Sequence, residues 1–274
     1  GLVKSSSFNF GRMLFGDGNG VLAKVSGIAS GVITVSSVKN IAEGMMIDFR
    51  NASGEVISAA GVRRITSIEG KQDYHGKLNY ATTTEVPTNS LVCIQGSYGQ
   101  EITGLGAIFN SSGTLYGLSK TDNKWLNPYI KSSTGELTEE KIQTAIDYLD
   151  ENAGSKVNFI VCSYGVKRAF QKLMNTYKKN VDVMELEGGY KTISYNGIPV
   201  VADRFCPDGT MYLLNTDDFT LHQLCDWQWL EGEDGKVIKQ VAGKPVYTAT
   251  LVKYADLLCD RPCGQGMLSG ITEA

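Results

Sequence analysis

The sequence predicts an α+β protein, and three observations lead to this prediction. Residues 138–152 and 163–177 repeat apolar side chains at spacings of three and four, which is typical of amphipathic helices. Short apolar or alternating runs, which are typical of strands, occur before, between and after these two segments. Asn196-Gly197 lies between two such runs and indicates a two-residue hairpin.

Composition limits the classes of function. The chain has 274 residues, enough for one large domain or two domains of about 150 residues each. Its net charge is −3, so no general electrostatic attraction to nucleic acid is expected. No apolar run approaches the ~20 residues of a membrane-spanning helix, and we therefore expect no membrane partner.

The cysteines and histidines do not form the pattern of a metal site. No two cysteines form a Cys-x-x-Cys pair, and only two histidines, His75 and His222, could complete a site. Neither histidine has a Ser, Asp or Cys partner nearby in sequence that would indicate a catalytic residue. We expect no catalytic, cofactor-binding or metal-binding residues, no cofactor, and reduced, largely buried cysteines at these positions: Cys93, Cys162, Cys206, Cys225, Cys259 and Cys263.

A glycine-rich segment, Gly16-Asp17-Gly18-Asn19-Gly20, lies near the start of the chain. It lacks the Gly-Lys-Ser/Thr ending of a phosphate-binding loop, and no acidic residues follow at the spacing of a calcium loop. The segment is therefore interpreted as a tight turn. An enzyme that uses this loop as its active site remains an alternative.

Residues 27–95 have the pattern of a small β-structure. Five short strands are predicted, with turn residues between them, and they suggest a barrel-like insertion. Few aromatic residues accompany Arg63-Arg64, so a stacking surface for nucleic acid is not expected. A carbohydrate-binding barrel from a phage tail or surface module remains an alternative. The predicted strands are residues 32–35, 45–49, 62–68, 77–80 and 91–94.

The first helix is predicted over Thr138 to Asn152. Its buried stripe consists of apolar residues at helical spacing, Ile142, Ala145, Ile146 and Leu149. Acidic residues occupy its first turn, where the helix dipole favours them, and Gly154 ends it. Asp147 and Glu151 lie one turn apart, but no His or metal motif accompanies them, so they are interpreted as solvated.

A strand, a helix and a hairpin are predicted next. Residues 157–162 form an apolar run, and Ser163 can cap the following helix. The strands at residues 190–195 and 198–203 flank the Asn196-Gly197 turn. Because Pro199 has no N–H donor, its strand is predicted to lie at a sheet edge or to be bulged.

The rest of the chain is rich in strands. Trp227 and Trp229 are predicted to pack on one face of a strand. A further hairpin is predicted, with its turn at Asp234-Gly235 and its strands at residues 229–230 and 237–238. Residues 247–254 alternate with period two.

Several segments together resemble one family. They are the Leu14–Leu22 segment with its Gly-Asp-Gly motif, the hairpin from Tyr195 to Val201, the Pro207-Asp208-Gly209 turn before residues 211–215, and the Arg261-Pro262 tail. These segments resemble the major capsid proteins of tailed bacteriophages and prophages with the Hong Kong 97 fold. The likeness covers residues 10–25 and 96–271.

The resemblance implies a Hong Kong 97-type capsid fold, with a central axial domain of helices around a sheet and a partial peripheral domain. It divides the chain into residues 1–26 as the start of the core, residues 27–95 as a barrel-like all-β insertion, and residues 96–274 as the axial domain and remaining peripheral strands. It implies a structural, non-enzymatic protein of the virion, assembled in the bacterial host cytoplasm. The expected partners are further copies, in hexamers and pentamers of an icosahedral shell, and packaged double-stranded DNA without sequence-specific contact.

The start of the chain departs from the family pattern. Family members have an N-terminal arm, an extended loop and a long spine helix before the Gly-Asp-Gly segment, whereas this sequence has almost nothing there. We therefore expect this chain alone to remain monomeric or in small oligomers, and the form with those parts to build shells. An encapsulin-like shell protein remains a further alternative.

Overall fold

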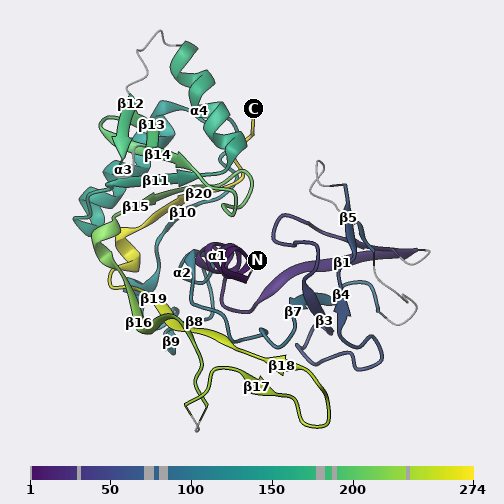
Figure 1. Ribbon diagram of the computed structural model, residues 1–274. Helices are drawn as coiled ribbons and strands as arrows, with labels where there is room; N and C mark the ends of the chain where they lie inside the picture. The colour runs from purple at the N-terminus through teal and green to yellow at the C-terminus, as the bar shows by residue number, and fades with distance from the viewer. Residues whose placement is uncertain are drawn as a thin grey trace.

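The computed structural model describes residues 2–29, 32–70, 77–79, 86–176, 183–186, 190–232 and 235–274. The strands in these ranges form two seven-stranded sheets, a long two-stranded ribbon and two short strand pairs. Figure 1 shows the two sheets in separate lobes, with helix α1 (Leu2–Leu14) between them. We call residues 21–94 the inserted lobe, and the lobe around the other sheet the main lobe. The predicted mixture of helices and strands is confirmed.

The inserted lobe is built on an antiparallel sheet. Its strand order is β4-β3-β7-β1-β2-β6-β5. A bulge between Val25 and Gly27 divides β1, so that its first part pairs with β7 and its second part with β2. Val21 pairs with Cys93, and the chain therefore enters and leaves this sheet at adjacent points. The strands are β1 (Val21–Ala29), β2 (Val32–Val35), β3 (Met46–Arg50), β4 (Arg63–Arg64), β5 (Ser67–Glu69), β6 (Lys77–Asn79) and β7 (Leu91–Ile94).

The predictions for this lobe are correct for most strands. The strand predicted over residues 62–68 is interrupted at Ile65, whose N–H donates to the Met45 carbonyl and whose carbonyl accepts from Gly44. Strand β1 was not predicted, because Gly27 breaks its alternation and its first residues follow the glycine-rich loop. Among the described residues, none of these strands pairs with the strands of residues 190–254. His75 lies outside the described residues.

The sheet of the main lobe is mixed. Its order is β10-β20-β15-β11-β14-β13-β12, and β11 pairs in parallel with β14, as β10 does with β20. Side chains of β11 alternate: Ile160 and Cys162 join the core beneath α3 and α4, whereas Val161 joins the core on the opposite face. The strands are β10 (Tyr129–Lys131), β11 (Phe159–Cys162), β12 (Val183–Leu186), β13 (Tyr190–Tyr195), β14 (Ile198–Ala202), β15 (Met211–Leu214) and β20 (Gly266–Leu268).

The two predicted helices form, with the predicted cap at Ser163 and the predicted stop at Gly154. Helix α3 (Glu139–Ala153) begins after Thr138, whose side chain accepts a hydrogen bond from the Lys141 N–H. It ends at Gly154, which adopts a left-handed conformation with φ of 57°. Helix α4 (Tyr164–Thr176) follows β11, and the Ser163 Oγ accepts from the Val166 N–H. Both helices pack their apolar stripes on one face of the sheet.

The predicted hairpin between β13 and β14 is confirmed. Asn196 and Gly197 both have positive φ, 49° and 82°, as a type I′ turn requires. The prediction for Pro199 is wrong, because β14 lies inside the sheet between β11 and β13. Pro199 faces Ser194 at a position of the hairpin that carries no ladder hydrogen bond, and pairing with β11 begins only at Val200. An interior strand can therefore contain Pro199, although proline has no N–H to donate to a neighbouring strand.

Helix α1 corrects the expectation that almost nothing precedes the Gly-Asp-Gly segment, since residues 2–14 are helical. Its C-terminal part is joined to the main lobe by a buried ion pair. The Arg12 guanidinium donates two hydrogen bonds to the Glu101 carboxylate, of 2.8 and 2.6 Å. Glu101 lies just before the short helix α2 (Leu105–Ile108), which packs beneath the main sheet.

A long ribbon extends from the main lobe. It pairs β16 (Phe219–Trp229) with β19 (Leu251–Cys259), and the chain between them forms a smaller pair, β17 (Lys239–Gln240) with β18 (Tyr247–Thr248). The predicted pairing of residues 229–230 with 237–238 is wrong: Trp229 pairs with Leu251. The remaining short elements are β8 (Thr114–Leu115), β9 (Leu118–Ser119), η1 (Lys124–Leu126), η2 (Thr216–Asp218) and η3 (Pro262–Gly264).

Candidate functional site

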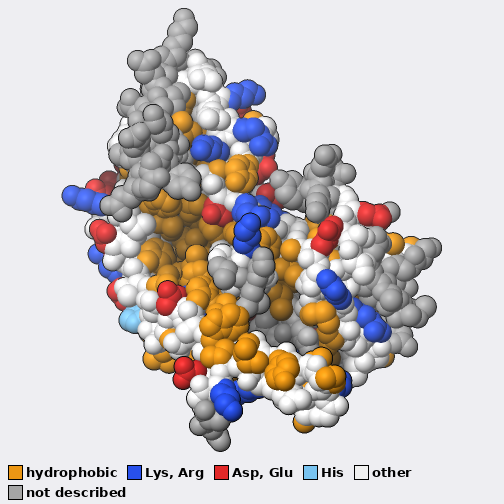
Figure 2. Space-filling model, viewed as in Figure 1, with side chains coloured by type: hydrophobic (Ala, Val, Ile, Leu, Met, Phe, Trp, Pro, Cys, Tyr) orange, Lys and Arg blue, Asp and Glu red, His pale blue; other side chains and the backbone are white. Residues whose placement is uncertain are grey.

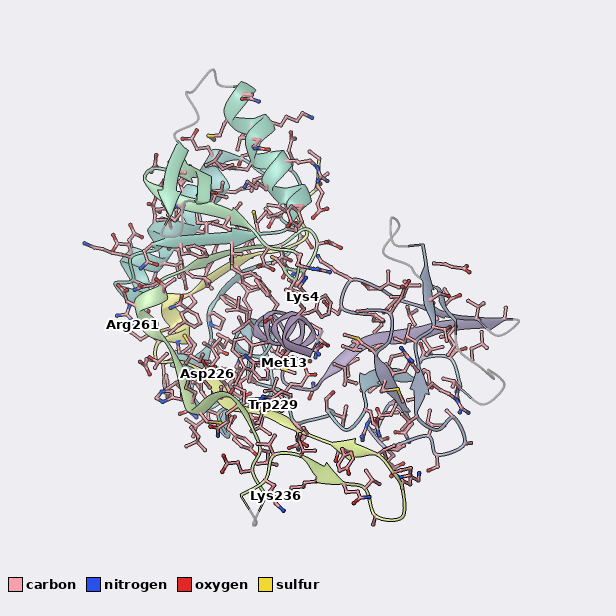
Figure 3. All side chains as sticks on the ribbon, in the orientation of Figure 1. Lys4, Met13, Asp226, Trp229, Lys236 and Arg261 are labelled. Atoms are coloured by element: carbon pink, nitrogen blue, oxygen red, sulfur yellow. The ribbon has the colours of Figure 1, made fainter. Side chains whose placement is uncertain are left out.

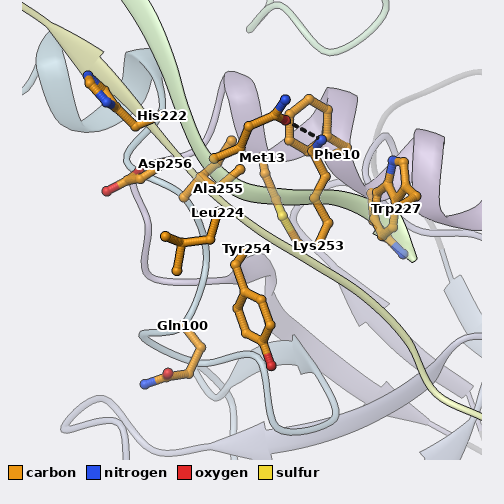
Figure 4. Close-up of a pocket in the computed structure, with 13 residues that line it drawn as sticks. Phe10, Met13, Gln100, His222, Leu224, Trp227, Lys253, Tyr254, Ala255 and Asp256 are labelled. Atoms are coloured by element: carbon orange, nitrogen blue, oxygen red, sulfur yellow. Dashed lines mark hydrogen bonds between the residues drawn. The ribbon is translucent and has the colours of Figure 1, made fainter. Parts of the chain in front are cut away.

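A groove of about 610 Å³ runs between helix α1 and the ribbon. Phe10 and Met13 line it from α1, Leu224 and Trp227 from β16, and Tyr254 from β19 (Figure 4). Figure 3 shows the region where α1, which carries Met13, meets the ribbon, which carries Asp226. The groove is therefore formed by segments more than 200 residues apart in the sequence.

The wall formed by the ribbon is unusually apolar for an exposed surface. Leu224 is 92% exposed, and Trp227, Trp229 and Tyr254 are also exposed. Figure 2 shows hydrophobic atoms extending from the groove toward the β17–β18 hairpin. A continuous apolar surface of this kind on a water-exposed element indicates a binding surface. Other exposed apolar residues of residues 219–259 are Leu221, Leu230, Ile238, Val246 and Tyr247.

Irregular pairing in the ribbon brings these side chains together. The register between β16 and β19 shifts twice, between Gln223 and Cys225 and again between Cys225 and Gln228. In a regular strand Leu224 and Trp227 would point to opposite faces, because their separation is odd. The shifts allow both to line the groove. Trp227 and Trp229, which were predicted to pack on one face of a strand, are both exposed, and only Trp227 lines the groove. Their placement on one face stays a prediction.

Lys253 provides the main charge in the groove. Its Nζ donates to the Gln223 Oε1 at 2.8 Å and to the Asp226 Oδ1 at 2.7 Å. It also lies 5.4 Å from the centre of the Phe10 ring and 5.9 Å from that of the Trp227 ring. The hydrogen bond from Lys253 lowers the pKa of the Asp226 carboxyl. Lys253 therefore joins the aromatic side chains of α1 and β16 and fixes one wall against the other.

Asp256 attaches the ribbon to the main lobe. Its carboxylate accepts from the Thr103 N–H at 2.6 Å and from the Thr103 Oγ1 at 3.2 Å. His222 lies opposite Asp256 in the ribbon. The structure therefore places an acidic residue beside His222 that is 34 positions away in the sequence. Lys253 and Asp256 thus form structural hydrogen bonds and are not arranged as a nucleophile with its base.

The glycine-rich segment is a tight turn, as predicted. The Asp17 carboxylate accepts from the Asn19 N–H at 3.0 Å and from its side-chain amide at 2.9 Å. The small cavity beside it, about 210 Å³, is lined by the carboxylates of Asp17, Glu101 and Asp208 and by two cations, Arg12 and Lys39. Both cations are already paired, Arg12 with Glu101 and Lys39 with Asp208.

The other residues considered in the sequence also have structural roles. Asp147 accepts a hydrogen bond of 2.7 Å from the Gln143 side chain, one turn away on α3. All six cysteines are free, and four of them are buried: Cys93, Cys162, Cys206 and Cys259.

Over the described ranges, no group of three or more His, Cys, Asp or Glu side chains could hold a metal ion. No helix in these ranges combines the length and apolar character needed to cross a membrane.

Sequence reasoning missed the groove. The signal available was a break in alternation, since residues 223–229 mix apolar, acidic and amide side chains within one strand. That signal marks an irregular strand. It does not reveal that α1 lies opposite.

Comparisons with known proteins give a family and two solved chains that match in part. The family model for SU10 major capsid protein matches residues 57–236, about two thirds of the chain. A chain of the cyanophage A-1(L) capsid asymmetric unit is 21% identical, with a TM-score of 0.48, over 65% of this chain and 61% of that one. A chain of the holo-SrpI encapsulin complex from Synechococcus elongatus PCC 7942 is 14% identical, with a TM-score of 0.41, over 54% and 56%. The chain thus spans about three fifths of the length of these solved chains. No curated protein matches.

Proposed function

The chain belongs to the SU10 major capsid protein family, that is, to the structural proteins of phage capsids, and from this premise we propose that its copies associate through the ribbon and the groove beside it. The observation that carries this proposal is the exposed apolar surface of the ribbon, centred on Leu224 and Trp227. A second copy of the chain is the partner that a self-assembling shell provides.

The energetics favour contact over exposure. Complete burial of one large apolar side chain is worth about 1.5–3 kcal/mol. Association costs at least about 4 kcal/mol in lost rigid-body freedom, so a few side chains acting together are needed. Leu224, Trp227, Trp229 and Tyr254 are 40–92% exposed, so a neighbouring copy that covers all four supplies a large part of that cost.

The finer features of the assembly follow from the family resemblance. The copies form hexamers and pentamers of an icosahedral shell in the virion, enclose double-stranded DNA without sequence-specific contact, and assemble in the host cytoplasm. The protein is not an enzyme, and the structural hydrogen bonds of Lys253 and Asp256 support this. It needs no cofactor.

The proposed architecture is a Hong Kong 97-type fold. The main lobe corresponds to the axial domain, and the ribbon to part of the peripheral domain, within residues 96–274. Residues 27–95 form a barrel-like insertion and residues 1–26 begin the core, except that β1 starts at Val21, so the sheet of the insertion includes the last residues of that first segment. The edge strands β4 and β5 support the barrel, because only Ile65 and Thr66 separate them in sequence although they stand at opposite ends of the strand order.

Electron microscopy and light scattering test the proposal on the complete gene product. We expect particles tens of nanometres across from the unmodified protein, and loss of assembly from a variant carrying Leu224→Ser and Trp227→Ser. The matched control carries Leu118→Ser and Trp125→Ser, which alters an exposed leucine and an exposed tryptophan outside the ribbon. Equal assembly by both variants would refute the role of the ribbon, and failure of the unmodified protein to assemble would refute the proposed function.

A further inference from the structure

The inserted lobe and the main lobe have separate hydrophobic cores. The buried residues of the inserted lobe's core lie between Leu22 and Val92, whereas the two cores of the main lobe are built from Leu105 onward. Strands β1 to β7 make their extensive contacts with one another, and no described strand of one lobe pairs with a strand of the other. Two units with separate cores are expected to move relative to each other unless a large apolar interface joins them.

The chain crosses between the lobes at two neighbouring points, and a glycine lies at each. Strand β1 begins directly after Gly20, and β7 ends two residues before Gly96. Both glycines have positive φ, 74° and 75°, which glycine adopts without the strain that other residues meet. The Gly99 N–H donates to the Asn19 carbonyl at 3.1 Å, so the two crossings are joined side by side. Backbone rotation at these two points can therefore turn the inserted lobe as a unit about one hinge.

An open cleft of about 670 Å³ lies between the inserted lobe and the rest of the chain. Val38, Ile41 and Ile68 line it from the inserted lobe, and Phe8 and Tyr164 line it from α1 and α4. These side chains do not form a shared core, since none of the three hydrophobic cores includes residues from both sides of the cleft. The cleft therefore leaves room for the two lobes to change their separation.

One lysine bridges this cleft. The Nζ of Lys39, in the inserted lobe, donates to the Cys206 carbonyl at 2.6 Å and to the Asp208 Oδ1 at 2.7 Å, both just before β15 of the main lobe. The Lys39 and Asp208 side chains are 17% and 41% exposed, so water and salt weaken the attraction between them. The contact therefore fixes the orientation of the inserted lobe and can open without unfolding either core.

We propose that the inserted lobe swings about this hinge, and that the contact of Lys39 with Asp208 is a latch that holds the lobe in one orientation. Helix α1 stays with the main lobe during the motion, because Phe8 packs on Phe205 with 5.1 Å between the ring centres. In the proposed shell, a latched and a released orientation let one chain meet its neighbours at different angles. That use rests on the proposed function, whereas the hinge and the latch do not.

Distances between the two lobes test the hinge and the latch. Spin labels are attached at exposed positions of the 274-residue chain, through Ser53→Cys in the inserted lobe and Glu151→Cys on α3. The partly exposed Cys225 and Cys263 are replaced by serine, so that the two introduced thiols react preferentially. Pulsed electron paramagnetic resonance then gives the distribution of distances between the labels, and circular dichroism checks that each variant is folded.

Two latch variants and one control give the result. Lys39→Met removes the latch from the inserted lobe, and Asp208→Asn removes its charge from the main lobe, while the control Lys24→Met changes an exposed lysine of the same lobe. In both latch variants a second distance should appear, or its fraction should rise at least about threefold, because a partly exposed ion pair changes an equilibrium about that much. The control should match the unmodified chain. Salt at about 1 M should raise the same fraction in the unmodified chain and have less effect on Lys39→Met.

Two results would overturn this inference. One narrow distance that is unchanged in both latch variants would show that other contacts hold the lobe. A broad distribution that neither variant alters would show that the lobe swings without a latch. Failure of the complete gene product to form particles would refute the proposed function, but it would leave these distances and their interpretation unaffected.

Discussion

Removing one partner of the Arg12–Glu101 ion pair should destabilise the protein strongly. Both side chains are almost completely buried, 4% and 2% exposed, and two hydrogen bonds join them across 89 residues of sequence. Two unit charges about 4 Å apart interact by about 4 kcal/mol at an effective dielectric constant of about 20. Loss of one partner also leaves the other charge buried without compensation. We therefore expect Glu101→Leu or Arg12→Met to cost about 3–5 kcal/mol of unfolding free energy.

The double variant distinguishes the interaction energy of the Arg12–Glu101 pair from the effect of lost packing around the two side chains. Arg12→Met with Glu101→Leu removes both charges, and its cost should be at least about 2 kcal/mol smaller than the sum of the two single costs. Guanidinium unfolding measures the free energies, and hydrogen exchange of α1 amides reports whether the helix detaches. The same cycle on the partly exposed Lys39–Asp208 pair, whose atoms are 2.7 Å apart, should give a coupling below about 1 kcal/mol. Additive single costs at Arg12 and Glu101, or costs under about 1 kcal/mol, would refute the reasoning.

Three further predictions concern the turn, a buried lysine and a buried thiol. Gly197→Val should cost about 1 kcal/mol or more, because φ is 82° there, whereas Gly27→Ala has ordinary room and should be nearly neutral; similar unfolding midpoints for the two would contradict the turn. Lys120→Met should cost about 3 kcal/mol in the same assay, since the buried Nζ donates to three backbone carbonyls at 2.5–3.0 Å; an unchanged midpoint would show that those carbonyls find other donors. Burial raises the pKa of the Cys162 thiol from 9.0 to about 12, so the folded state retains a proton that the unfolded chain releases. The contribution of this thiol to the free energy of unfolding should therefore be constant below pH about 9 and fall above it by about 1.4 kcal/mol per pH unit. Cys162→Ala should reduce the slope of unfolding free energy against pH in that range. An unaltered pH profile in the variant would disprove the prediction.

Elements governed by nearby residues could be predicted from the sequence. Helix α3 forms as expected because its cap at Thr138, its apolar stripe and its stop at Gly154 all lie within 17 residues. The Asn196-Gly197 turn is equally local, since both residues tolerate the positive φ that the turn requires. In these cases the backbone preference and the apolar pattern favour the same structure, and tertiary contacts only reinforce it.

Elements that depend on distant partners could not be predicted. The position of Pro199 inside the sheet follows from where β11 begins to pair, which the hairpin sequence does not specify. The start of β1 at Val21 depends on Cys93, more than 70 residues later. In both cases the sequence pattern indicated a strand or a possible strand boundary. The strand with which the segment pairs, elsewhere in the chain, determined its position in the sheet.

The groove depends on distant contacts more than any other feature. Leu224 and Trp227 both line the groove because the register of β16 against β19 shifts twice. Helix α1 forms the opposite wall because Arg12 holds its end at Glu101 and Phe10 contacts Lys253 and Trp227. An apolar strand residue in a sequence is ordinarily assigned to a core. In the part of the chain that the structure describes, no second sheet covers the ribbon, so the same residues form an exposed surface. From the proposed association of copies through this surface we expect that loosening α1 by Arg12→Met also impairs particle formation, measured by electron microscopy, even where the ribbon itself is unchanged.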